Sequence, residues 1–92
     1  MKFYNIDKVP TQVQQELADK FREIRKNKKI SQTQLANSSG VSLGSIKRFE
    51  QTGQISLESL LKLAHLFDRL NDFDSVFKAE ENFKAIEKLF NN

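Results

Sequence analysis

Lys47 and Arg48 are adjacent basic side chains in a short segment whose apolar residues set their direction. Ile46 and Phe49 are three positions apart, the spacing of one helical face, so both should point to a core and leave the basic pair outside. The other outward residues of this helix are Leu43, Gly44 and Gln51. Lysine and arginine in such a position can donate hydrogen bonds to guanine O6 and N7 or grip a phosphate.

The basic residues of the chain are concentrated in its first two thirds. Residues 1–67 contain eleven Lys and Arg against six Asp and Glu, whereas residues 68–92 contain four against six. Six basic residues precede the candidate helix: Lys20, Arg22, Arg25, Lys26, Lys28 and Lys29. This cluster suits a phosphate backbone, and Lys26 and Lys29 are our candidates for phosphate contacts. The alternative is a solvated helix end, because a helix dipole favours cations there.

Local signals between Ser31 and Glu50 predict two short helices joined by a tight turn. Ser31 and Gln34 have the spacing of a capping box, so a helix should cover 32–39. Gly40 can supply the left-handed residue that ends this helix. Ser42 can then cap a second helix over 42–51, the one that carries Lys47 and Arg48.

Two further helices are predicted around this pair. Thr11, with Gln14, should cap a helix over 11–28, and Ser56 should cap a fourth helix. The predicted inward residues of these two helices are Val13, Leu17, Phe21 and Ile24, followed by Leu57, Leu60, Leu61, Ala64 and Phe67. No alternating pattern indicates a strand. The fold class is therefore all-α, a compact bundle of four to six helices.

The helix pair resembles the XRE-type, phage-repressor-like helix-turn-helix regulators. The recurring motif of that family matches Gln32, Ala36, Gly40, Val41 and Ile46. The resemblance extends over roughly residues 13–70. It implies a domain that binds double-stranded DNA without a cofactor, with the second motif helix in the major groove.

The resemblance, together with the outward positions, assigns roles to individual residues. Base reading is assigned to Leu43, Gly44, Lys47 and Arg48. Phosphate binding is assigned to Gln32, Lys26, Lys29, Ser42, Gln51, Thr52 and Gln54. The family often places a buried structural ion pair at the positions of Arg25 and Glu50.

Three of these residues have an alternative reading. Leu43 suits a thymine methyl group but could equally pack at the edge of the motif. Gly44 could permit close approach to DNA or be merely tolerated. Gln32 could bind phosphate, brace a reading side chain or be a plain exposed residue.

The ends of the chain are predicted to lie outside the domain of residues 11–70. Residues 1–10 should be an irregular arm, and residues 71–92 a helical tail with Asn71 or Asp72 and then Asn82 as caps. The tail's candidate interface residues are Phe73, Val76, Phe77, Phe83, Ile86 and Phe90. The tail could fold back over the first helix or form a dimer or partner interface, since a large exposed apolar patch is a liability.

Composition argues against several other classes of protein. The chain has no cysteine and no apolar amino-terminal run, so we expect neither disulfides, a signal peptide nor a membrane anchor, and a cytoplasmic location. His65 is the only histidine and has no paired ligand motif, which argues against a metal site. Without a glycine-rich phosphate loop either, an enzyme is not expected.

The sequence thus predicts a DNA-binding transcriptional regulator, a repressor that binds a symmetric operator as a homodimer. One alternative is an antitoxin or a restriction-system controller, whose tail contacts a cognate toxin or another protein. Another is a helix-turn-helix protein that binds only proteins. Steep salt dependence of duplex binding would separate DNA binding from the last alternative.

Overall fold

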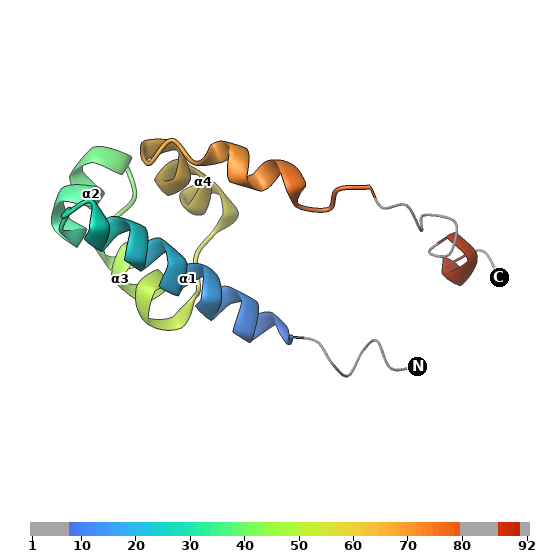
Figure 1. Cartoon of the computed structure of the whole chain (residues 1–92). Coiled ribbons are helices and arrows are strands. Elements are labelled where there is room, and N and C mark those ends of the chain that lie inside the picture. The colour runs from blue at the N-terminus through green and yellow to red at the C-terminus, as the bar shows by residue number, and fades with distance from the viewer. Residues whose placement is uncertain (1–7, 80–86, 91–92) are drawn as a thin grey trace.

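The computed structural model of the chain describes residues 8–79 and 87–90, and all its regular elements are helical (Figure 1). Within residues 8–79 the α-helices are α1 (Pro10–Asn27), α2 (Gln32–Ser39), α3 (Leu43–Thr52) and α4 (Leu57–Leu66). A 3₁₀ helix, η1 (Leu70–Ser75), follows α4, and residues 87–90 are also helical. Over the described residues, the all-α prediction is confirmed.

The helix ends of the motif follow the local signals in the sequence. Ser31, Ser42 and Ser56 each accept a hydrogen bond from a backbone N–H three residues later, so all three predicted serine caps are present. Gly40 ends α2 in the left-handed conformation with φ 81°, as predicted. Gly53 ends α3 in the same way with φ 82°.

The predicted start of the first helix is wrong by one residue. Helix α1 begins at Pro10 rather than at residue 11, and its N-cap is Val9 rather than Thr11, which lies two residues later. Proline suits the first helical position because its fixed φ is already helical and its missing N–H is not needed there. Gln12, and not Gln14, accepts the hydrogen bond from the N-cap, at 3.0 Å between Val9 N and Gln12 Oε1.

The core lies between the four helices and is organised around aromatic side chains. Phe49, Leu35, Ile46 and Leu63 are the largest fully buried residues. The ring of Phe21 lies 5.6 Å from that of Phe49 and 5.3 Å from that of Phe67, measured between centroids. These contacts join α1 to α3 and to the end of α4, and aromatic pairs at this separation add stability beyond their buried area.

Three residues that we predicted to be in the core are exposed. Val13 is 42% exposed, Leu17 is 40% exposed and Leu57 is 67% exposed. In α1, fully buried Ala18 occupies the inner face with Phe21, so Val13 and Leu17 lie on its flank. In α4, Leu63 is fully buried although it was not predicted to be. Apolar residues on α4 cover more than one face, and the packing partner decides which face is inside.

The chain turns after α4 at Asp68, which is left-handed with φ 59°, and we call residues 68–79 the tail from here on; they contain the described start of the predicted tail, 71–92. Its 3₁₀ helix has Arg69 as N-cap without a side-chain cap, so the prediction of a cap at Asn71 or Asp72 is wrong. Asp72 instead accepts a hydrogen bond from Arg69 Nε at 2.8 Å. The predicted cap at Asn82, with Phe83 and Ile86, lies outside the described residues, whereas Phe90 is exposed.

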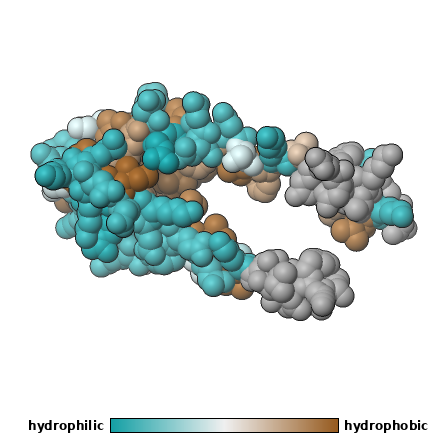
Figure 2. All heavy atoms as spheres, viewed as in Figure 1, coloured by the Kyte–Doolittle hydropathy of each residue, from teal (hydrophilic) through white to brown (hydrophobic). Residues whose placement is uncertain are grey.

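The tail and the start of α1 extend from the domain in the same general direction, with an open gap between them (Figures 1 and 2). Within residues 8–79 and 87–90, no helix combines the length and the apolar character needed to cross a membrane.

Candidate nucleic-acid interface

Helix α3 presents its polar residues on the surface and its apolar residues to the core. Ile46, Phe49 and Glu50 are buried. Exposed positions of the helix include Gly44, Lys47, Arg48 and Gln51, whereas Leu43 is half-buried. The serine cap at one end and the glycine at the other set the bounds of this outward surface.

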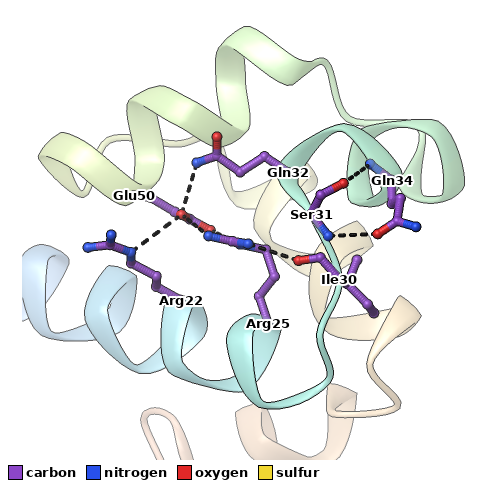
Figure 3. A network of polar contacts seen from close by, with 7 residues as sticks. All are labelled: Arg22, Arg25, Ile30, Ser31, Gln32, Gln34 and Glu50. Atoms are coloured by element: carbon purple, nitrogen blue, oxygen red, sulfur yellow. Dashed lines mark hydrogen bonds and ion pairs between the residues drawn. The ribbon is translucent and has the colours of Figure 1, made fainter.

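A buried ion pair holds α3 against α1. Arg25 Nε donates to Glu50 Oε2 at 2.7 Å, and Arg25 Nη2 donates to Glu50 Oε1 at 2.9 Å (Figure 3). The third guanidinium nitrogen donates to the carbonyl of Ile30 at 2.8 Å. A bidentate contact of this kind fixes the orientation of the two side chains as well as the distance between them. Because the charges of Arg25 and Glu50 neutralise one another inside the domain, the pair positions α3 and is not itself free to bind a ligand.

Gln32, at the start of α2, joins the same network. Its Nε2 donates to Glu50 Oε1 at 3.0 Å, and the residue is half-buried (Figure 3). The interpretation of Gln32 as an exposed residue without a specific contact is therefore excluded. The contact ties the amino-terminal end of α2 to α3. The capping box of Ser31 and Gln34 fixes the same end of α2, with both reciprocal hydrogen bonds present.

A shallow polar depression opens beside this network. It is lined by Arg22, Arg25, Gln32, Lys47, Glu50 and Gln51. Arg22 Nε lies 4.0 Å from Glu50 Oε1, and its side chain is half exposed. Our site prediction gave Arg22 no individual role. Its position three residues before Arg25, within the basic cluster, was the available signal. The depression collects positive charge from α1 and α3 around a carboxylate that Arg25 already neutralises.

Arg48 points to a different part of the surface from Lys47. Its Nε and Nη2 donate to Gln54 Oε1 at 3.0 and 2.5 Å. The loop that carries Gln54 is itself held by Thr52, whose hydroxyl donates to the Arg48 carbonyl and accepts from Gln54 N–H. The two basic side chains that we grouped as base readers are therefore separated, with Lys47 beside Arg22 and Gln51 and Arg48 beside the α3–α4 loop.

The remaining predicted phosphate binders are spread over the surface. Ser42 is engaged in capping, since its Oγ accepts from Ser45 N–H and donates to Ser45 Oγ. Lys26 and Lys29 are exposed at the end of α1, where Lys29 has a left-handed φ of 58°. Lys29 lines a depression next to α2 and Phe67, which is separate from the depression that Lys47 lines.

Gly44 offers a prediction that separates its two possible roles. A Cβ at this position would meet nothing within 4 Å, and its φ is not left-handed. Gly44→Ala should therefore raise the free energy of unfolding by about 1 kcal/mol, the difference in helix propensity. Denaturant melts measure this gain. If duplex affinity falls in the more stable variant, glycine serves close approach to DNA, whereas unchanged affinity means that it is only tolerated.

Comparison with known families agrees with this geometry. The helix-turn-helix family model HTH_3 matches residues 21–70, which include α2, α3, α4 and the ion-paired part of α1. Neither curated proteins nor solved structures gave a significant match. The matched segment is more than half of the chain. The protein therefore belongs to the XRE-type helix-turn-helix family of DNA-binding transcriptional regulators.

Proposed function

We propose that this regulator is a cytoplasmic repressor that binds a two-fold symmetric operator as a homodimer, with α3 in the major groove. The observation that supports the proposal is that a buried ion pair with α1 fixes the position of α3. A buried ion pair fixes this helix from behind, while Lys47, Arg48 and Gln51 remain on its exposed side. Groups that read bases must be held in place by their supporting shell, and the network around Glu50 supplies that support.

We propose that Lys47 and Arg48 read different parts of the operator. Lys47 donates to guanine O6 and N7, and it lines the same polar depression as Arg22, whose positive charge attracts the phosphate backbone. Arg48 is oriented by Gln54, so it contacts the base or phosphate that lies nearest to the loop after α3. Leu43 makes an apolar contact with a thymine methyl group, and Gly44 lets the helix approach closely.

Phosphate contacts surround this reading surface in the proposal. Gln51, Thr52 and Gln54 act at the carboxyl end of α3, and Gln32 and Ser42 act at the amino ends of α2 and α3. Lys26 and Lys29 act at the end of α1, where their charge attracts the backbone from a distance. Such contacts set the register of the protein on DNA and carry no sequence information of their own.

A matched pair of substitutions tests the proposed reading. Lys47→Ala should weaken operator binding by about 1–3 kcal/mol and relax the preference at one base pair. Lys29→Ala should weaken binding to all duplexes alike and reduce the salt slope by about 1. The measurement is affinity for operator, single-base variants and scrambled duplex at several salt concentrations. Equal losses on operator and scrambled DNA for Lys47→Ala would show that Lys47 does not read a base.

A second candidate function is that of an antitoxin or controller with a protein partner. The observation that favours it is the exposure of Val76 and Phe77 in the tail, because exposed apolar side chains suit a protein interface. Co-expression with the product of the adjacent reading frame tests this candidate. A stable complex that dissociates on Phe77→Ser would support it.

A further inference from the structure

Two groups of exposed apolar residues lie on α1 and on the tail, besides single exposed residues such as Leu57 and Leu66. One is the α1 stripe, which we define as the N-cap Val9 with Val13 and Leu17, and which recurs every four residues from the N-cap along one flank of α1. The other is the tail knob, Val76 and Phe77, where Phe77 is 100% exposed. Large apolar residues grouped on a surface mark a contact with another molecule or segment.

Packing explains why neither surface is covered within the described chain. Helix α1 packs against α3 through its inner face, and Gln14 abuts the backbone of Gly53. Among the helices of residues 8–79, η1 of the tail packs on α4 alone. Figure 2 shows hydrophobic residues on the sides of both extensions that face the open gap.

We infer that the α1 stripe is the receiving surface for the tail knob of a second copy, and that the exchange is reciprocal. The inference rests on the proposed homodimeric function and adds the acceptor surface to it. Each copy carries one stripe and one knob, so a single two-fold contact uses both stripes and both knobs and leaves none exposed. Such a closed arrangement is the usual form of a symmetric dimer.

The charges around the two surfaces fit an apolar contact between copies. Glu16 beside the stripe is paired with Lys8 at 2.8 Å, and Arg69 in the tail is paired with Asp72 at 2.8 Å. Burial at the interface therefore strands neither carboxylate. Within the described residues, Lys20 of α1 and Asp74 of the tail have no ion-pair partner, and their opposite charges can face one another across the contact.

The size of the contact is consistent with a dimer. Burying one phenylalanine removes about 150–250 Å² from water, and two copies of Phe77 supply roughly a quarter of the 1,600 Å² of a standard interface. The stripes, Val76 and the surrounding polar rim supply the remainder. Phe77 is thus the central anchor of the proposed contact, a role that aromatic residues often have in interfaces.

The position of the stripe leaves the polar surface free. Val13 and Arg22 are nine residues apart on α1, or about two and a half turns, so they point to opposite sides of the helix. Arg22 lines the polar depression with Lys47. A second copy can therefore occupy the stripe without covering the candidate DNA surface.

Disulfide trapping tests the inference directly, because the chain has no cysteine of its own. Leu17→Cys and Phe77→Cys are purified as separate proteins, mixed and oxidised without DNA. We expect the mixed covalent dimer to form faster than either self-linked dimer. When a chain that carries both cysteines is oxidised at low protein concentration, the disulfide should still form between two chains rather than within one. A link formed within one chain would mean that the tail covers its own stripe, and would overturn the inference.

Sedimentation of charged variants gives an independent readout. Val13→Lys and Phe77→Lys should each raise the dimer dissociation constant about 30-fold or more, as expected for a central anchor. Gln15→Lys adds the same charge to the same helix and should leave the constant unchanged, with circular dichroism verifying the fold of all three. A monomeric wild-type protein, or a dimer insensitive to both variants, would overturn the inference. If the trapped dimer forms but no duplex binds, the proposed function fails and the interface stands.

Discussion

Glu50→Ala is expected to lower the free energy of unfolding by about 3–5 kcal/mol, the cost of breaking a buried ion pair by removing one partner. The substitution leaves the Arg25 guanidinium buried without its carboxylate, and Gln32 loses the acceptor for its amide. Arg25→Ala should cost a similar amount, because the buried Glu50 then keeps only the amide of Gln32 and the more distant Arg22, and the carbonyl of Ile30 loses its donor. Denaturant melts of both variants measure these losses.

The double variant Arg25→Ala/Glu50→Ala should lose less than the sum of the single losses, since no charge is left unpaired. Glu16→Ala is the matched control, because its pair with Lys8 is exposed, and exposed pairs contribute about 0–1 kcal/mol. Additive losses would mean that the two side chains act independently. Losses near that of the control would mean that the pair does not support α3.

Gly53→Ala is expected to destabilise the domain by about 2–5 kcal/mol, combining the left-handed backbone penalty with an overpacking penalty. Gly53 has φ 82°, and a Cβ at this position would lie 2.8 Å from both the backbone carbon and the Cβ of Gln14. Backbone atoms of α1 cannot rotate away as a flexible side chain could. The substitution should therefore push α1 away from the end of α3, with thermal or denaturant melts measuring the loss.

Gly40→Ala separates the two contributions to this loss. Gly40 has nearly the same φ, 81°, but a Cβ there would meet nothing within 4 Å. It should lose only the backbone penalty of about 1–2 kcal/mol. Equal losses at the two glycines would show that the contact between Gly53 and Gln14 has no energetic weight.

Local patterns in the sequence were sufficient to predict the motif. A serine marks a helix start because its hydroxyl accepts a hydrogen bond from the backbone N–H three residues later, and a glutamine at that later position can bond back to the serine N–H. A glycine that can adopt a positive φ marks the end of the helix. The predicted caps at Ser31, Ser42 and Ser56 and the turn at Gly40 are therefore all present. These signals act within one turn of helix, so no knowledge of distant residues is needed to read them.

The packing faces could be predicted only in part, because they depend on the partner helix. The apolar spacing of α1 placed Val13 and Leu17 inward, yet α3 packs against a face centred on Ala18. In α4 several apolar faces compete, and Leu63 rather than Leu57 is buried. Because Val13 and Leu17 were assigned to the core, the sequence pattern did not predict that they would form an exposed stripe on α1.

The site divides in the same way between local and long-range information. The sequence by itself determined that Lys47 and Arg48 lie on the outward side of α3, since helix periodicity settles that question. Only the tertiary structure decided that Lys47 lies beside Arg22 of α1, and that Arg48 turns to Gln54. Side chains from different helices meet only after the helices have packed, and their contacts follow from crossing geometry that no spacing along the chain records.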